Sequence, residues 1–139
     1  MTGRSRGERN LSVVRTARAD PKRLKARRRG RIAEHLCRWH LRLRGWRILA
    51  CDWRCPAGEI DILARRRDVL AVIEVKSRPD FATGAAALLP RQRRRIARAT
   101  EAFLLMRPDL AAMAVRFDVM VVEPRHLPRH LPGAWRSDD

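Results

Sequence analysis

The sequence has few acidic residues, few cysteines and no long apolar run. It holds 15 Asp and Glu against 32 Lys and Arg, so its 139 residues carry a formal net charge of +17 at pH 7. A charge of this sign and size favours polyanionic partners, with nucleic acid as the leading candidate. No stretch approaches the roughly 20 apolar residues of a membrane span, and no apolar segment follows the first charges as in a secretory signal.

Three cysteines, an odd number, provide no disulfide framework, and this favours the reducing cytoplasm as the location. Cys51 and Cys55, taken with His35 and His40, contain the residue types of a zinc site. Their spacing is irregular, whereas structural zinc sites normally use tighter Cys and His pairs. We therefore expect free thiols in a cytoplasmic protein.

The length predicts one small domain with tails, and a hydrophobic content of 45% is sufficient for a core. Residues 1–23 are rich in Arg and lack an apolar period, which predicts a disordered basic arm. The domain is expected over residues 24–122. Residues 123–139 contain three prolines and are expected to form a disordered tail, in which His126 and His130 are not on a helix and hold no metal.

Two helices are predicted from a period near 3.6. Residues 24–44 place apolar side chains at i, i+4, i+7 and i+11, and this predicts a core-facing side formed by Ile32, Leu36, Trp39 and Leu43. Residues 90–107 predict a second helix with a core face formed by Ile96, Ala99, Phe103 and Met106. The segment between residues 77 and 90 contains two prolines and a glycine and is expected to be a loop over the site.

Residues 58–64 and 69–75 alternate with a period of two and predict a pair of strands. In the first strand one side is expected to carry Ile60, Ile62 and Ala64, and the other side Glu59, Asp61 and Leu63. In the second strand a face that begins apolar and ends charged carries Leu70, Val72, Glu74 and Lys76. A further strand is expected over residues 116–122, with Phe117, Val119 and Val121 facing inward and Asp118 paired with Arg116 or a neighbouring strand.

Glu74 interrupts an apolar run, where a carboxylate is costly unless a cation or a metal pairs with it. Lys76 lies two residues further along the same face, and the neighbouring strand is expected to bring Asp61 alongside. Two carboxylates repel each other, and a divalent cation held by oxygen ligands removes that repulsion. The alternative is an ordinary ion pair between Glu74 and Lys76 at a strand end.

An Asp followed across two strands by Glu-x-Lys resembles the PD-(D/E)xK superfamily of metal-dependent nucleases. A narrower resemblance, to the YraN family of bacterial proteins, covers Gly30 to Val122. It is carried by Gly30-x-x-Ala33-Glu34, Gly45-Trp46-Arg47-Ile48-Leu49, Gly58-Glu59-Ile60-Asp61, Glu74-Val75-Lys76-Ser77-Arg78 and Arg116-Phe117-Asp118-Val119. The chain departs from the family pattern at Asp52, where an Asn is common, and this places an added negative charge near the expected site.

The resemblance implies an α/β fold with a restriction-endonuclease-like core, as in archaeal Holliday-junction resolvases. This is a mixed four-stranded sheet flanked by helices, in the order helix, strand, strand, strand, helix, strand. It also implies that Mg²⁺ or Mn²⁺ is held by Asp61, Glu74, the backbone carbonyl of Val75 and Glu34, with Lys76 as the catalytic cation. For Glu34 the alternative is a salt bridge to Arg38, four residues later on the same helix.

The second helix also presents a stripe of one charge sign, formed by Arg91, Arg94, Arg95 and Arg98. Like charges at helical spacing are costly, so a phosphate backbone explains the stripe better than a solvated face. Arg78, at the end of the Glu-x-Lys strand, is grouped with the stripe as a nucleic-acid contact.

The leading hypothesis is a metal-dependent endonuclease, or a degenerate relative of one, that hydrolyses phosphodiester bonds in DNA, including branched DNA. A homodimer is considered because nucleases that cut two strands often pair. The first alternative is a non-catalytic nucleic-acid-binding accessory protein in DNA repair, recombination or uptake. The second is a basic protein associated with RNA or the ribosome, which rests on the charge alone.

Overall fold

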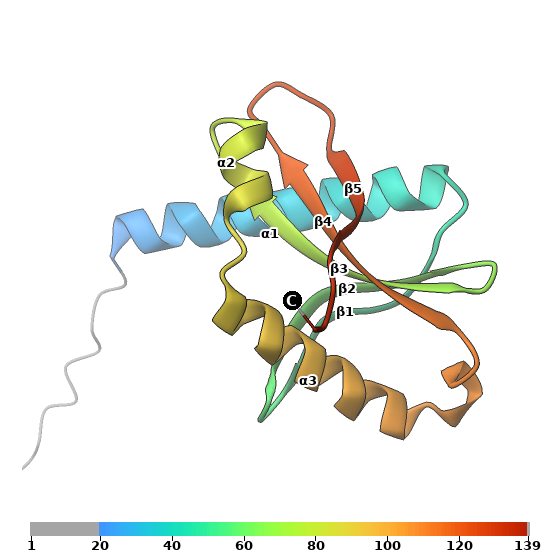
Figure 1. Cartoon of the computed structure of the whole chain (residues 1–139). Helices are drawn as coiled ribbons and strands as arrows, with labels where there is room; N and C mark the ends of the chain where they lie inside the picture. Colours follow the sequence, from blue (N-terminus) through green and yellow to red (C-terminus); the bar gives the residue numbers. More distant parts are fainter. Residues whose placement is uncertain (1–19, 139) are drawn as a thin grey trace, which may run out of the picture.

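A five-stranded mixed sheet organises the chain, and helices cover both of its faces (Figure 1). The computed structural model describes residues 20–138. Along the chain the elements are α1 (Pro21–Leu43), β1 (Arg47–Cys55), β2 (Gly58–Arg66), β3 (Val69–Ser77), α2 (Phe81–Ala86), α3 (Pro90–Met106), the 3-10 turn η1 (Pro108–Leu110), β4 (Ala114–Val122) and β5 (Arg129–Trp135). This confirms the α/β class, and the arrangement is consistent with a restriction-endonuclease-like core.

The strands lie in sequence order across the sheet, from β1 to β5. β3 and β4 are parallel and are joined by a crossover through α3, whereas the other neighbouring pairs are antiparallel. The β3–β4 ladder runs over the full strands, from Val69 opposite Ala114 to Ser77 opposite Val122. Side chains on both faces of these two strands are buried, as their near-continuous apolar sequences require.

The expectation of a disordered tail and of only four strands is wrong, because the tail supplies β5. This strand pairs antiparallel with β4 and covers the edge that β4 would otherwise expose. Trp135 stacks on Phe117 with ring centroids 4.1 Å apart, and the backbone N–H of Gly133 donates to Asp118. The domain therefore extends beyond residue 122, to at least Trp135.

The side of α1 that packs on the sheet differs from the predicted side. Ala33, Cys37 and Leu41 are buried and pack with sheet side chains that include Ile62, Ala64, Ala71, Ile73 and Met120. The predicted core face is instead exposed, by 53% at Ile32, 41% at Leu36, 53% at Trp39 and 83% at Leu43. The buried positions follow an i, i+4, i+8 row that begins with small side chains, so the helix can approach the sheet closely and turns its larger apolar side chains outward.

α3 covers the opposite face through Ile96, Ala99 and Phe103, as predicted, but Met106 at its end is 70% exposed and is not part of the core. The partners of α3 on the sheet include Leu63, Leu70, Val72, Val119 and Val121. Ile60 also belongs to this side, whereas Ile62 and Ala64 face α1, so the expected common face of these three residues is wrong. The alternation of side chains between the two faces of β2 is therefore interrupted at Asp61, between Ile60 and Ile62.

Two boundaries also differ from the expectation. Residues 21–23 belong to α1, because the Asp20 side chain accepts from the backbone N–H of Lys22 and Pro21 occupies the first turn. The rest of the predicted basic arm, residues 1–19, lies outside the described residues. The predicted loop before α3 contains the short helix α2, capped by Asp80 and packed on β4 where Gly84 meets Val121.

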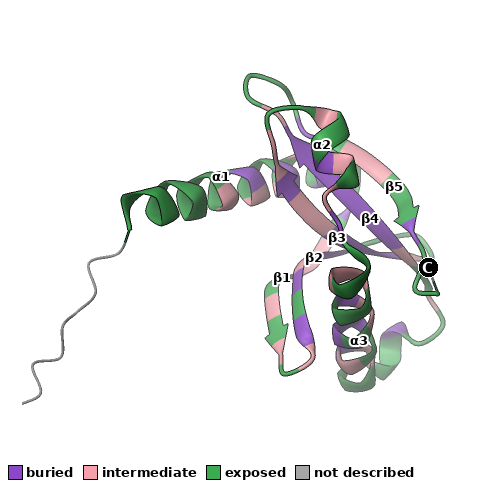
Figure 2. Ribbon diagram, turned by 60° about the vertical axis from the view of Figure 1, so that its left-hand side comes forward, coloured by how far each residue is buried: buried purple, intermediate pink, exposed green. Residues whose placement is uncertain are grey.

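The first turns of α1 extend beyond the sheet and are exposed (Figure 2). They carry a dense run of Lys and Arg from Lys22 to Arg31. Neither α1 nor any other helix of the described residues is both long and apolar enough to cross a membrane.

Candidate metal centre

Asp61 on β2 and Glu74 on β3 face each other where these two strands stop pairing. The β2–β3 ladder ends at Ile62 opposite Ile73, and the next position along it belongs to the two acidic residues. The Asp61 carboxylate accepts a hydrogen bond from the backbone N–H of Val75 over 2.9 Å. A hydrogen bond also joins the carboxyl groups of Asp61 and Glu74. The Asp61 carboxylate thus accepts from a backbone N–H of β3 in place of a backbone carbonyl, and this hydrogen bond holds the Asp61 side chain in position.

Glu74 and Lys76 share one face of β3, as the period of two predicts. Their charged atoms are 3.8 Å apart, and their side chains are only 13% and 11% exposed. A buried ion pair gains little over apolar packing, because both charges lose their hydration. The pair therefore does not by itself account for placing two charged groups here.

α1 and β1 bring two further carboxylates, those of Glu34 and Asp52. One carboxylate oxygen each of Glu34, Asp52 and Asp61 lies within 4.8 Å of the other two. Asp52 lies across from Asp61, between the paired positions Cys51–Ile62 and Trp53–Ile60. Its backbone has φ +48°, a left-handed conformation that Asp and Asn adopt more readily than most other residues. The structure forms no ion pair between Glu34 and Arg38, since Glu34 hydrogen-bonds to Asp52.

The crowding of carboxyl groups shifts their pKa values. Burial, the hydrogen bond to Asp52 and repulsion by Asp61 raise the pKa of Glu34 to about 8. Burial and the charge of Asp61 raise the pKa of Glu74 to about 8, against the opposing effect of Lys76. Burial also raises the pKa of Asp61, while the N–H of Val75 opposes this shift. A cation among these groups would restore their charged forms.

The donor set fits a hard divalent cation. Glu34, Asp52 and Asp61 offer carboxylate oxygens close enough to share one ion, and Glu74 adjoins Asp61 but is not within the same 4.8 Å group. Such oxygens suit Mg²⁺ and Mn²⁺, and a shared cation would replace the mutual repulsion with attraction. The sequence predicts the backbone carbonyl of Val75 as a metal ligand. The structure additionally shows the N–H of Val75 donating to Asp61 and holding it in position.

Arginines lie on both sides of the acidic cluster, which comprises Glu34, Asp52 and Asp61 together with the adjoining Glu74. A narrow cavity of about 160 Å³ opens toward α3 and is lined by Glu59, Asp61, Glu74, Gln92, Arg95 and Ile96. A wider one of about 620 Å³ opens toward the first half of α1 and is lined by Arg27, Gly30, Arg31, Glu34, Asp52, Arg54 and Glu59. A group of carboxyl side chains with Arg95 on one side and Arg27, Arg31 and Arg54 on the other suits a phosphate that is held by arginines while a metal contacts it.

Of the predicted arginine stripe, only Arg95 lines a cavity of this site. Arg91, Arg94 and Arg98 are exposed on α3 outside that cavity. Arg78 is half-buried and donates to the carbonyl of Ser77 next to it, and its backbone N–H bonds to Val122.

α3 is held close to the cluster by Gly58. A Cβ atom at this position would lie 2.8 Å from the backbone oxygen of Arg95, so the Gly-x-x-Asp motif permits the contact that brings Arg95 and Gln92 to the cavity. Sequence reasoning did not assign Gln92, although it lies one turn before the core residue Ile96. It also left Asp52 outside the site, although the substitution for Asn was the available signal.

The profile of a protein family described as "Uncharacterised protein family UPF0102" matches residues 33–122. The chain belongs to this family. A UPF0102 protein of Paramagnetospirillum magneticum is 50% identical over 117 residues, which cover 81% of this chain and 91% of that relative. One from Parvibaculum lavamentivorans is 49% identical over 113 residues, 81% and 85% of the two chains. One from Rhodopseudomonas palustris strain BisB18 is 44% identical over 117 residues, 84% and 87% of the two chains.

Membership in UPF0102 confirms the resemblance to YraN-like bacterial proteins. The matched residues run from the buried face of α1 to the end of β4 and so contain the three clustered carboxylates, Glu34, Asp52 and Asp61, and also Glu74. The names of these UPF0102 relatives state no activity, so the function is argued from the site.

Proposed function

We propose that this UPF0102 protein is a metal-dependent nuclease that hydrolyses phosphodiester bonds in DNA. The observation that supports it is the convergence of Asp61 and Glu74 at the point where β2 and β3 separate, with the Lys76 ammonium 3.8 Å from Glu74. Glu34 reaches the same place from α1. Carboxylates with a lysine beside them are the groups that a metal-assisted phosphodiester hydrolysis requires.

In this mechanism Asp61, Glu74 and Glu34 would hold Mg²⁺ or Mn²⁺, and Asp52 and the Val75 carbonyl would be further oxygen donors. The bound ion would supply Lewis-acid polarisation of the scissile phosphate and a water of lowered pKa. Lys76 is largely withdrawn from solvent, so its charge acts in a weakly screened environment, where it stabilises negative charge developing on the phosphate. Arg95 lines the cavity and would hold a non-bridging oxygen of the substrate.

DNA is the proposed substrate because the cationic groups follow an extended surface. Arg27 and Arg31 line one side of the cluster and Arg95 the other, so a polyanion has cations on both sides of the proposed scissile position. Branched DNA, single strands and duplexes all present such a backbone.

The second candidate function is a non-catalytic nucleic-acid-binding protein. It is favoured by the arginines on both sides of the carboxyl groups, Arg27 and Arg31 on one side and Arg95 on the other, which can contact a polyanion without a bound metal. In that case the Glu74–Lys76 pair is structural, and the arginines alone bind the polymer.

The deciding experiment is cleavage of labelled branched, single-stranded and duplex DNA with Mg²⁺ or Mn²⁺. Asp61→Asn and Glu74→Gln keep the shape of each side chain and remove a charge, and we expect both to abolish cleavage. Lys76→Met is expected to reduce the rate about 100-fold, as for loss of a single group that stabilises transition-state charge. Affinity for DNA in EDTA is expected to stay within about twofold, because single changes among many phosphate contacts alter affinity little.

Glu101→Gln serves as the control, since it removes one exposed carboxylate on α3 outside the site. It is expected to cut at the wild-type rate. Cleavage by Asp61→Asn at that rate would contradict the assignment of the centre. A wild type that binds all three DNAs and cuts none would make the binding protein the better description.

A further inference from the structure

A second, strongly basic pocket lies at the C-terminal end of α1, on the face of the sheet that α1 covers. Its cavity volume is about 470 Å³, and it is lined by His40, Arg44, Trp46, Arg66, Arg116, Pro128, Arg129, His130 and Pro132. Four of these residues are arginines and two are histidines, and no acidic residue of the described chain lines it. Glu34 lies on α1 ten residues before Arg44, which directly follows the end of this helix, so roughly 15 Å of helix separates the pocket from the acidic cluster.

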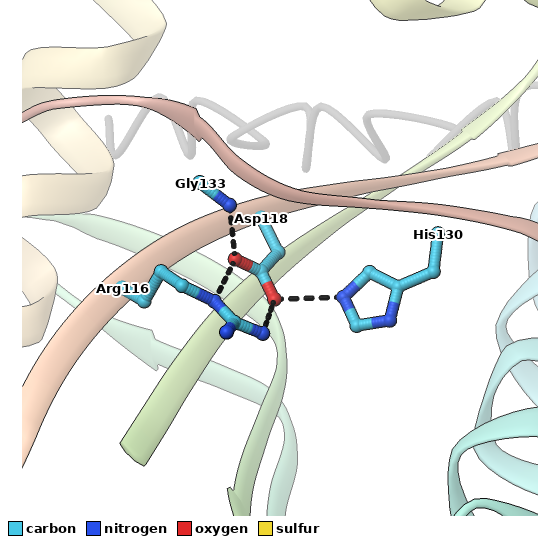
Figure 3. A network of polar contacts seen from close by, with 4 residues as sticks. All are labelled: Arg116, Asp118, His130 and Gly133. Atoms are coloured by element: carbon cyan, nitrogen blue, oxygen red, sulfur yellow. Dashed lines mark hydrogen bonds and ion pairs between the residues drawn. The ribbon is translucent and has the colours of Figure 1, made fainter.

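The acidic residue beside this pocket is already fully engaged. Asp118 is completely buried, and its carboxylate accepts two hydrogen bonds from Arg116 over 2.9 and 3.0 Å. It also bonds the ring of His130 over 2.7 Å and accepts from the backbone N–H of Gly133 over 2.8 Å (Figure 3). A carboxylate has about four lone-pair sites, so Asp118 fixes Arg116 and His130 and has no capacity to neutralise the other cations.

Trp46 contacts two of the four arginines of the pocket, whereas Arg129 lies over Phe81. The guanidinium of Arg66 lies 4.5 Å from the centroid of this ring, and that of Arg116 lies 5.5 Å from it. Arg66 also donates to the backbone carbonyl of Arg44 over 3.1 Å. These contacts reduce the conformational freedom of the guanidinium groups before any ligand arrives, which favours binding.

Two of the four arginines have no acidic partner. Within residues 20–138 no carboxylate forms an ion pair with Arg44 or Arg66, whereas Arg129 lies 3.8 Å from Glu123. The carbonyl end of α1 attracts cations, but it is equivalent to only about half an elementary charge. That charge is too small to balance the arginines gathered here, so the pocket keeps an excess of positive charge.

We propose that this pocket binds a phosphate group of a nucleic acid, at a position separate from the acidic cluster. Guanidinium forks match phosphate oxygens in pairs, and four guanidinium groups line the pocket. Those of Arg66 and Arg116 lie over Trp46, and within residues 20–138 Arg44 and Arg66 have no carboxylate partner. The choice of nucleic acid rests on the proposed function, but the binding itself requires no catalysis. The separation along α1 corresponds to a few nucleotides of one strand, so a single substrate can contact both sites.

The test is a titration followed by ¹⁵N NMR in EDTA, with the indole N–H of Trp46 and the backbone N–H of Gly133 as reporters. The probes are inorganic phosphate, a deoxynucleoside 5′-monophosphate and a 12-nucleotide DNA strand with or without a 5′-phosphate. We expect both reporters to shift with the DNA strand. The variant Arg44→Gln/Arg66→Gln is expected to bind about tenfold more weakly at this site and to lower the salt dependence of affinity by about one ion.

The matched control is Arg65→Gln/Arg125→Gln, which removes the same charge from exposed positions outside the pocket and is expected to retain the reporter shifts. Shifts that require the 5′-phosphate identify a terminal monoester, and shifts without it identify a backbone diester; both support the proposal. Reporters that respond to none of the probes, or only to inorganic phosphate and the mononucleotide, overturn it. So does unchanged DNA binding at the reporters in the Arg44→Gln/Arg66→Gln variant.

The two proposals fail independently. Since the titration contains no divalent metal, Asp61→Asn is expected to leave the reporter shifts unchanged. If the protein cuts DNA but the reporters do not shift, the proposed function is supported and the second binding site is contradicted. If the reporters shift but the protein cuts no DNA, the second binding site is supported and the proposed nuclease function is contradicted.

Discussion

Glu34 and Glu74 have pKa values raised to about 8, in each case first because burial penalises the charged carboxylate. The unfolded chain titrates these groups near 4.5, so between about pH 4.5 and 8 the folded protein binds protons that the unfolded chain has released. Stability falls with rising pH wherever the folded state holds more protons. The carboxyl groups of the centre therefore oppose folding near neutral pH unless a cation joins them.

The first prediction concerns this residue-scale effect. The melting temperature of the metal-free protein is expected to fall by several degrees as the pH rises from 5 to 8, measured by circular dichroism in EDTA. Glu74→Gln is expected to flatten the dependence, because the amide does not titrate. Added Mn²⁺ is expected to raise the melting temperature most at pH 8, since metal binding must displace protons at lower pH.

Glu101→Gln is the control, because it removes an exposed carboxylate on α3 that does not line the acidic centre, and it is expected to retain the wild-type slope. A melting temperature that stays constant or rises between pH 5 and 8 in metal-free wild type would contradict the protonated state of the centre.

At the scale of elements, two glycines have opposite packing requirements. Gly58 begins β2, where a Cβ atom would lie 2.8 Å from the backbone oxygen of Arg95 on α3. Gly30 lies within α1, where a Cβ atom would meet nothing within 4 Å. Only the first glycine is needed to let two elements approach each other.

The second prediction follows from this difference. Gly58→Ala is expected to lower the free energy of unfolding by about 1–3 kcal/mol, because backbone atoms must move to admit the methyl group. Gly30→Ala is expected to raise it by about 0.5–1 kcal/mol, since alanine favours a helix more than glycine does. Urea denaturation measures both. Equal effects of the two substitutions would show that α3 is not closely packed on β2 at Gly58.

α1 shows how an element with two apolar rows can be placed. Its buried row of Ala33, Cys37 and Leu41 packs on the sheet, while the second row is exposed to solvent: Ile32, Leu36, Trp39 and Leu43. Both rows have helical spacing. The choice between them depends on how closely the helix approaches the sheet, and smaller side chains allow the closer approach.

At the scale of the whole molecule, an acidic centre is embedded in a chain of net charge +17. The arginines on the exposed side of α3 extend the positive surface away from the centre. Such a distribution attracts a polyanion along the surface and concentrates negative charge only where a cation would bind.

The third prediction tests the contribution of α3 to this surface. Arg94→Gln/Arg98→Gln is expected to lower the slope of log affinity for duplex DNA against log salt concentration by about two, since each lost phosphate contact removes about one released ion. Fluorescence anisotropy in EDTA between 50 and 200 mM salt measures the slope. The control Arg65→Gln/Arg125→Gln removes equal charge elsewhere. Indistinguishable slopes for the two variants would show that α3 does not contact DNA.

The strand pair around the centre was predictable from its own residues. The period of two placed Leu70, Val72, Glu74 and Lys76 on one face, and the structure confirms that face. The strongly apolar run of β3 also identified Glu74 as exceptional. These features depend on local backbone geometry, which neighbouring residues in the sequence largely determine.

The fold class and the family could also be predicted from the sequence, because the order of motifs and the type of each element are local patterns. The composition likewise established a basic chain without a disulfide framework. What the sequence determined by itself was therefore the kind and order of the central elements, together with two of the acidic residues that meet at the centre.

The tertiary structure decided which side of each element meets another. It placed Ala33 rather than Ile32 in the core, ordered the proline-containing tail as β5, and brought Asp52 and Gln92 to the acidic centre. It also gathered Arg44, Arg66 and Arg116 from three distant segments into one pocket. Such contacts depend on the distances between packed elements and on strand pairing across the sheet, and no local periodicity carries that information.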